Sequence, residues 1–295
     1  MDILSLLLGM GGMGGLSVFA AFYNRKNARR PNVSRLYTVM VTVAALLGWG
    51  VLYAFDFSFE VRVLLYSLFY GVGYATAMLG VVGALRAGSV ALTAFVKQFS
   101  FVFVSIWGYF FFPGEHFTWQ AGLGIALIAL AMFLCLVAGK KSDKEEGRPT
   151  VTLRWLLYAA MILGGNALCS ILQKYQQIAY PGEHKSMMML FGVAFAVLVA
   201  ALFSVGEDKT HWRVAVKSSF YFPLFAGVCS AALNLAILLL ATSEIFSSGF
   251  VFSALAVGGL VVTLVADLVF FRERLSLRQW LGMVIGTGAL VFLNV

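Results

Sequence analysis

One basic residue stands inside an otherwise apolar run. Lys97 lies in the stretch TAFVKQFSFVFVSIWGYFFF, residues 93–112, which holds no other charged side chain. An ammonium group is unstable in a low-dielectric surrounding, so it must face water, a ligand or an opposite charge. Such a group can bind an anionic solute or take part in proton transfer. Lys97 is therefore the first candidate for functional chemistry in this chain.

A rival interpretation of Lys97 involves Asp267, the other ionisable residue well inside an apolar run. A Lys97–Asp267 ion pair would neutralise both charges, and it could act as a gate that breaks in one conformation and forms in another. The sequence leaves three roles open for Lys97: contact with a substrate or coupling ion, a structural ion pair, and snorkelling to the membrane surface. Trp107 is a further gating candidate, or a member of the interfacial aromatic belt.

Uncharged polar residues inside apolar runs form the second group of candidates. Tyr70 and Tyr74 are about one helical turn apart, and Asn166 and Gln173 are about two turns apart, so each pair shares a helix face. In a membrane such groups either hydrogen-bond to neighbouring helices or line a wet cavity. With Lys97, they predict a substrate-binding surface made by six polar residues: Tyr70, Tyr74, Thr76, Asn166, Gln173 and Asn234.

The chain offers little to enzyme chemistry. Its histidines, His116, His184 and His211, lie in separate polar segments. The sequence holds no metal-ligand spacing, nucleophile motif or phosphate-binding loop. We expect no enzyme activity, no cofactor and no bound metal, and any transport would run on gradients.

The elements that must position these residues are membrane-spanning helices. The 295 residues are 61% hydrophobic and 12% charged, whereas a soluble domain carries about 25% charged residues. A bilayer core needs about 20 apolar residues per helix. Ten such runs are predicted, at 3–23, 36–54, 61–84, 88–112, 118–138, 154–178, 186–204, 220–241, 248–271 and 277–294.

The basic residues indicate how these runs are oriented. The net charge is +8, but Lys and Arg lie mainly in short loops, where they anchor helices, and not in a nucleic-acid-binding motif. Seventeen of them fall in odd-numbered loops and three in even-numbered loops. The positive-inside rule therefore predicts cytoplasmic odd-numbered loops and both termini outside.

The second half of the sequence echoes the first across a polar linker at 140–153. The segment FFPGEHFTWQAGLGIALIALAMFL aligns with VFFRERLSLRQWLGMVIGTGALVFL, so that Glu115 matches Glu273, and the same offset carries Thr76 onto Asn234. Five spans per half, in 1–139 and 154–295, require the two halves to insert in opposite senses. Inverted repeats are frequent in secondary transporters, because exchanging the conformations of the halves moves a central site between the two faces.

These segments resemble a known family. The repeated pattern in GEHFTWQAGLG and RERLSLRQWLG, together with GALRAGSVALTAF at 83–95 and NALCSILQKY at 166–175, is similar to the EamA-type repeat of the drug/metabolite transporter (DMT) superfamily. The resemblance covers nearly the whole chain. It implies a central cavity formed mainly by spans one, three, four, six, eight and nine, with spans five and ten bracing the outside. Such families are usually drawn with cytoplasmic termini, contrary to the charge distribution here.

The sequence thus predicts an all-α polytopic membrane protein of ten transmembrane helices, arranged as two inverted five-helix repeats. We expect a secondary active transporter of a small polar organic metabolite in a bacterial cytoplasmic (inner) membrane, working by alternating access. The cation at Lys97 favours an anionic or zwitterionic solute, with protons as a candidate coupling ion. The alternative is a non-transporting membrane receptor or scaffold on the same fold, which would show no flux under any gradient.

Overall fold

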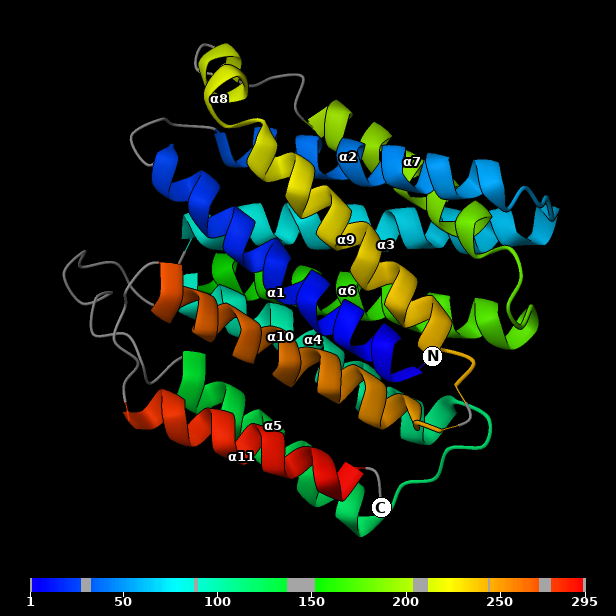
Figure 1. Cartoon of the computed structure of the whole chain (residues 1–295), viewed down its shortest axis with the longest axis vertical. Coiled ribbons are helices and arrows are strands. Elements are labelled where there is room, and N and C mark those ends of the chain that lie inside the picture. Colours follow the sequence, from blue (N-terminus) through cyan, green and yellow to red (C-terminus); the bar gives the residue numbers. More distant parts are fainter. Residues whose placement is uncertain are drawn as a thin grey trace.

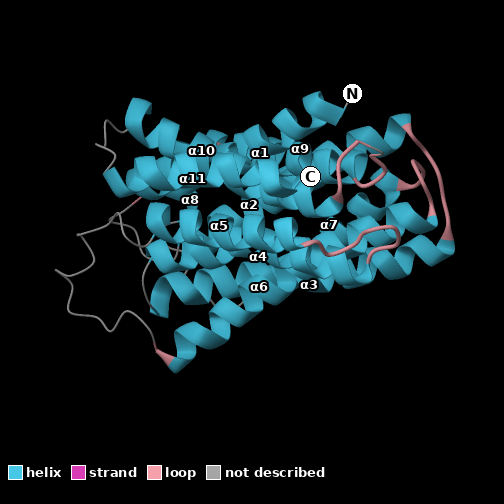
Figure 2. Cartoon of the chain, turned by 90° about the horizontal axis from the view of Figure 1, so that it is seen from below, coloured by secondary structure: helices cyan, strands magenta, loops and turns pink. Residues whose placement is uncertain are grey.

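The computed structural model describes residues 2–27, 33–87, 90–136, 152–203, 212–243, 245–270 and 277–293. All regular secondary structure in those ranges is α-helical, and the helices run side by side in one bundle (Figures 1 and 2). Their bounds are α1 (Asp2–Lys26), α2 (Val33–Phe55), α3 (Val61–Ala87), α4 (Val90–Phe111), α5 (Trp119–Leu136), α6 (Leu153–Ala179), α7 (Lys185–Phe203), α8 (Trp212–Ser219), α9 (Tyr221–Leu240), α10 (Ser248–Phe270) and α11 (Leu277–Leu293).

Length and composition make this chain an integral multi-pass membrane protein. In the described ranges, seven helices are long and apolar enough to cross a bilayer: α1, α2, α3, α6, α7, α9 and α10. Three shorter apolar helical segments accompany them, at Val96–Phe111, Trp119–Leu134 and Trp280–Leu293. Most of the polar linker predicted at 140–153 lies outside the described residues.

The short helix α8 replaces part of what the sequence predicts as a loop. It has eight residues, too few to cross a membrane. Ala215 is buried, and Trp212 packs against a small cluster that contains Tyr23 and Leu36, while Arg213 is exposed. This division into an apolar and a polar side explains why a search for long apolar runs missed α8.

Two helix pairs at the centre of the bundle pack closely through glycine. On α1, a Cβ at Gly12 would lie 2.7 Å from the backbone oxygen of Cys229 on α9. On α6, a Cβ at Gly165 would lie 2.5 Å from the backbone oxygen of Gly73 on α3. Small residues let membrane helices approach to this distance, where van der Waals contact holds them together. These close approaches join α1 to α9 and α3 to α6.

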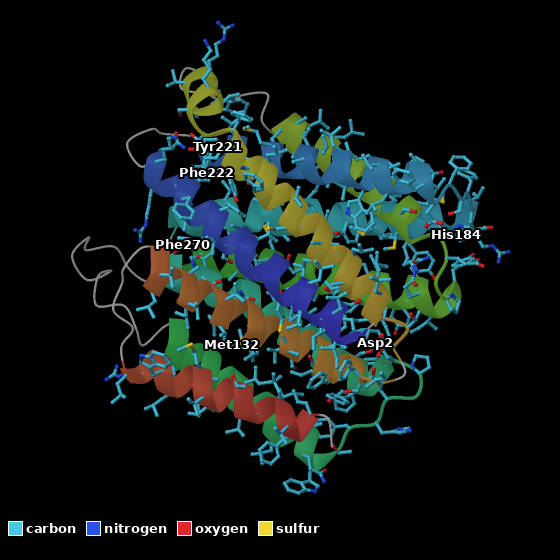
Figure 3. The ribbon with its side chains drawn as sticks, viewed as in Figure 1. Asp2, Met132, His184, Tyr221, Phe222 and Phe270 are labelled. Atoms are coloured by element: carbon cyan, nitrogen blue, oxygen red, sulfur yellow. The ribbon has the colours of Figure 1, made fainter. Side chains whose placement is uncertain are left out.

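The bundle has two chemically different ends. We call the end where α1 finishes and α2 begins the basic end, marked by Arg25, Lys26 and Arg35. The opposite end, which holds Asp2 and Glu183, we call the acidic end. In Figure 3, the labels of Tyr221, Phe222 and Phe270 mark the basic end, whereas those of Asp2 and His184 mark the acidic end. Figure 1 shows both chain ends at the acidic end.

Candidate functional site: a cavity at the centre of the bundle

A cavity of about 240 Å³ lies among six helices, α1, α2, α3, α4, α6 and α9. It extends from Asn24, an exposed residue near the basic end, to Gln173 and Asn234 deeper in the bundle. Much of its wall is apolar, with Met13, Leu16, Phe101, Leu233 and Ile237 among the lining residues. Cavities of this kind, apolar with a few placed polar groups, are typical of small-molecule sites.

Among the described residues that line this cavity, Lys97 is the only charged one. Its Nζ makes no hydrogen bond or ion pair with the residues that the structure describes, and only its backbone oxygen is engaged, accepting from Ser100 Oγ at 2.6 Å. Lys97 lines the cavity from α4, and its positive charge would stabilise a bound anion there because the wall has a low dielectric constant.

The rival ion pair with Asp267 lies outside what the structure describes. The backbone of Asp267 belongs to α10, but the position of its side chain is not among the described ones. The gate formed by Lys97 and Asp267 stays a prediction.

A hydrogen-bonded group of three polar side chains stands at the inner part of the cavity. Tyr70 Oη donates to Asn234 Oδ1 at 3.0 Å, and Gln173 Nε2 donates to the same oxygen at 3.0 Å. Asn234 Nδ2 in turn donates to the backbone oxygen of Ser230 at 2.8 Å. Three helices, α3, α6 and α9, are thus connected through uncharged groups, as expected where backbone and side-chain polarity must be satisfied within the membrane.

Of the seven residues predicted to bind substrate, six line the cavity. They are Lys97, Tyr70, Tyr74, Asn166, Gln173 and Asn234. Thr76 is not among the lining residues, because it follows Tyr74 by about 200° around the helix and so projects from a different side of α3. Trp107, the gating candidate, is not among them either, and its ring stacks on Phe111 with centroids 4.2 Å apart.

The sequence did not predict the apolar residues of the cavity wall or several of its polar residues. Tyr37 and Thr38 of α2 line the cavity, as does Ser170 of α6. Ser170 was detectable, since it lies four residues from Asn166 and three from Gln173 and shares their face. The positions of Met13 and Phe101 in the cavity wall could not be predicted, because an apolar residue in a membrane helix can face lipid, protein or a cavity.

Three hydrogen bonds join separate chain segments at the acidic end of the bundle. Glu115, in the loop between α4 and α5, accepts a hydrogen bond from the backbone nitrogen of Ser248 at 2.6 Å. Lys174 Nζ of α6 donates to the backbone oxygen of Ala241 at 2.5 Å. Asp2, at the start of α1, accepts from the hydroxyl of Ser243. The three contacts involve Ala241 and Ser243, which follow α9, and Ser248, the first residue of α10.

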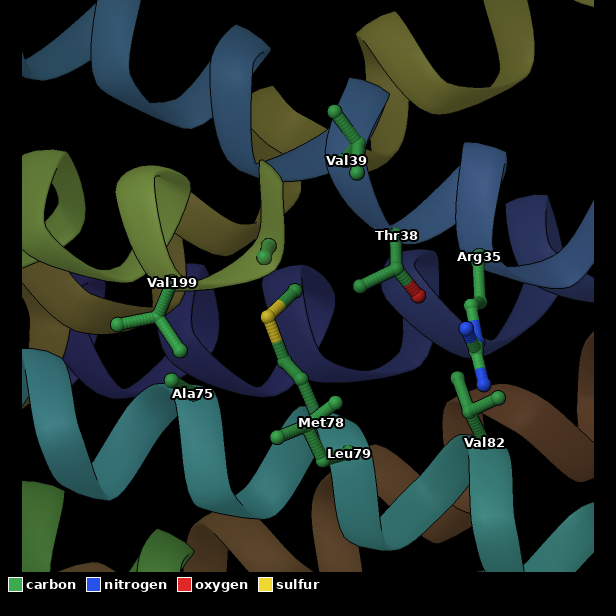
Figure 4. A pocket seen from close by; sticks show the side chains of 9 residues that line it. Arg35, Thr38, Val39, Ala75, Met78, Leu79, Val82 and Val199 are labelled. Carbon is green, nitrogen blue, oxygen red and sulfur yellow. The ribbon is translucent and has the colours of Figure 1, made fainter. Parts of the chain in front are cut away.

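A second, much smaller cavity of about 20 Å³ lies between α2, α3 and α7 (Figure 4). It shares Thr38, Met78 and Val82 with the wall of the central cavity. Arg35 lies at its edge in Figure 4. The space is too small for an organic solute, and we assign it no function.

Comparisons with known proteins identify a fold and nothing finer. No family model matches the sequence, and no curated protein matches it. A solved structure described only as "Crystal structure of protein" is similar over 97% of this chain and 95% of that chain, with a TM-score of 0.72 and 12% sequence identity. At this identity the likeness shows a shared fold alone, so the function must be argued from the cavity.

Proposed function

We propose that this chain is a secondary active transporter that carries a small organic solute through the central cavity by alternating access. The observation on which this rests is Lys97: a cation without a partner in the described part of the chain, facing a cavity large enough for a small metabolite. Ionisable groups inside membrane bundles are costly and tend to mark substrate or ion pathways. The solute class that this cation favours is anionic or zwitterionic.

The packing of the helices supports the arrangement as two inverted repeats of five spans. The proposed counterparts are α1 and α6, α2 and α7, α3 and α9, α4 and α10, and α5 and α11. Helix α1 packs on α9 and α10, and its counterpart α6 packs on α3 and α4. Likewise α2 packs on α9 while α7 packs on α3. Exchanging the halves leaves this set of neighbours unchanged, as a pseudo-two-fold axis requires.

The two ends of the bundle differ in the way expected for one conformation of an alternating-access cycle. Near the basic end the wall reaches the exposed residue Asn24, whereas Glu115 and Lys174 close the acidic end with hydrogen bonds. By the positive-inside rule the basic end faces the cytoplasm. We propose that this conformation is open to the cytoplasm and that release of the acidic-end contacts gives the opposite one. Membership of the drug/metabolite transporter superfamily, as the sequence resemblance implies, is part of this proposal.

The test is solute uptake into proteoliposomes. Radiolabelled benzoate, γ-aminobutyrate and phenylalanine are offered to purified protein that has been reconstituted with a gradient of each solute or of protons. We expect saturable uptake of at least one of them, lowered by at least about tenfold in Lys97→Met because a low-dielectric charge contact is lost. The matched control is Gln98→Met, which alters the neighbouring buried residue that does not line the cavity.

Two outcomes would contradict the proposal. If folded wild-type protein moves none of the three solutes under any gradient, the receptor or scaffold interpretation replaces transport. If uptake is saturable but equal in wild type and Lys97→Met, the chain transports by a route that does not use the cavity cation.

A further inference from the structure

The two polar regions of the cavity stand far apart along the bundle. Near the start of α4 and α6, Trp155 Nε1 donates to Thr93 Oγ1 at 3.2 Å, which fixes the relative height of the two helices. Lys97 follows Thr93 by one turn, whereas Gln173 follows Trp155 by five. The difference in helical rise between the positions of Lys97 and Gln173 is about 20 Å.

A second contact confirms this offset from the other end of the same helices. Tyr175 Oη donates to the backbone oxygen of Phe111 at 3.2 Å. Counted back from this contact, Gln173 and Lys97 again differ by about 18 Å of helical rise. The two contacts also show that α4 and α6 run in the same direction. A molecule that touches both polar regions must therefore be elongated, even after the side chains have covered part of the distance.

The amide of Gln173 is oriented by its neighbours. Asn234 Nδ2 donates to the backbone oxygen of Ser230 at 2.8 Å, and this places Asn234 Oδ1 toward Gln173. Only the nitrogen of Gln173 can then face that oxygen, because two amide oxygens would repel each other. Gln173 Nε2 also contacts Met189 Sδ at 3.4 Å, which leaves its oxygen on the other side.

Gln173 Oε1 is consequently a buried acceptor without a donor in the described part of the chain. Leaving such a group unpaired is unfavourable, and an unpaired group in a native structure calls for an explanation such as a functional role. The hydroxyl of Tyr70 already donates its one hydrogen bond to Asn234 Oδ1, so the Tyr70 oxygen can only accept a further hydrogen bond. This region of the cavity therefore offers acceptors, whereas Lys97 offers a charged donor.

We propose that the cavity selects an elongated monoanion that carries a hydrogen-bond donor at the end far from its anionic group. The anion lies on Lys97, an apolar middle contacts side chains such as Met13, Leu16 and Phe101, and the distal donor pairs with Gln173 Oε1. Gln173 is fully buried at the cavity wall, so a side-chain rearrangement admits the donor. This inference rests on the proposed function because it concerns the same cavity.

The test uses two isomeric probes that differ only in the donor. The probes ω-hydroxydecanoate and ω-methoxynonanoate contain the same atoms and the same charge, but the ether cannot donate. A third probe, the amino alcohol of the same chain length, keeps the hydroxyl and exchanges the anion for a cation. Binding is measured by calorimetry on the whole protein in lipid nanodiscs, and the heat from empty nanodiscs is subtracted.

We expect wild-type protein to bind ω-hydroxydecanoate about tenfold more tightly than ω-methoxynonanoate, and the amino alcohol more weakly than either acid. In Gln173→Met the two isomers should bind equally, whereas in Lys97→Met both acids should weaken together. The control is Gln176→Met, at an equally buried glutamine of α6 that bonds to the backbone oxygen of Glu183 and does not line the cavity. It should keep the preference for the hydroxyl.

Equal binding of the isomers to wild type, or a hydroxyl preference that survives in Gln173→Met, would overturn the inference. If Gln173→Met does not fold, Gln173→Asn is measured in its place, because its side chain is one methylene shorter and moves the amide oxygen away from the bound donor. Selective binding without uptake of either acid into proteoliposomes would contradict transport and leave this selectivity standing. If both acids are taken up and bind with equal affinity, transport stands and the proposed selectivity for a distal donor is contradicted.

Discussion

The carboxylate of Glu115 holds the first turn of α10. One of its oxygens accepts from the backbone nitrogen of Ser248 at 2.6 Å, and the other lies 3.4 Å from the nitrogen of Gly249. The first backbone N–H groups of a helix have no partner within the helix, and the positive end of its dipole favours an anion. Glu115 thus supplies, from the α4–α5 loop, acceptors for the first two backbone N–H groups of α10, and in the proposed cycle this contact keeps the acidic end closed.

We predict that Glu115→Gln loosens this closure. The amide keeps the shape and one acceptor but loses the charge that strengthens both contacts. In a background without the native cysteines, Ile237→Cys places a thiol at a buried lining position of α9. A membrane-impermeant maleimide added at the acidic end should label it several-fold faster in Glu115→Gln than with Glu115 present.

The control for this experiment is Glu183→Gln at the same end of the bundle. Glu183 is exposed, and its carboxylate lies 3.8 Å from His184, where an ion pair contributes little. It should leave the labelling rate unchanged. Identical rates in Glu115→Gln and the Glu115 background would show that the cap on α10 does not keep the acidic end closed.

The sequence predicts those cavity residues that are polar and lie within an otherwise apolar run. Lys97, Asn166 and Gln173 stand out in apolar runs, and all three line the cavity. Helical spacing would have refined this set further, since Tyr70, Tyr74 and Met78 recur at four-residue intervals on one face while Thr76 falls off it.

Contacts between distant segments could not be anticipated in the same way. Lys174 binds the backbone oxygen of Ala241, and a backbone oxygen leaves no trace in the residue types. The same holds for the orientation of the Gln173 amide, which depends on the carbonyl of Ser230 through Asn234. The sequence therefore predicts which residues are candidates for the site, whereas their hydrogen-bond partners can be assigned only from the three-dimensional structure.

We predict that neighbouring glycines of α6 differ sharply in tolerance to alanine. A Cβ at Gly165 would lie 2.5 Å from the backbone oxygen of Gly73, so α3 and α6 would have to separate. Such overpacking costs about 1–3 kcal/mol. A Cβ at Gly164 meets nothing within 4 Å, and alanine there raises helix propensity by up to about 1 kcal/mol.

Thermal unfolding of the purified protein in one detergent measures this difference. Gly165→Ala should unfold several degrees below wild type, and Gly164→Ala at or slightly above it. Equal loss in both variants would mean that the α3–α6 contact is not the cause.

We predict that the basic end of the bundle faces the cytoplasm. Arg25 and Lys26 end α1, and Arg35 lies in the first turns of α2, and the positive-inside rule counts such residues close to membrane helices. Two exposed positions report the two ends: Arg25→Cys at the basic end and Glu183→Cys at the acidic end. In intact cells that express cysteine-depleted protein, a membrane-impermeant maleimide should label the thiol at position 183 and leave that at position 25 unlabelled until the cells are opened. The reverse pattern would place both chain ends in the cytoplasm, as the resembling family is usually drawn, and the end of the cavity near Asn24 would then face the outside.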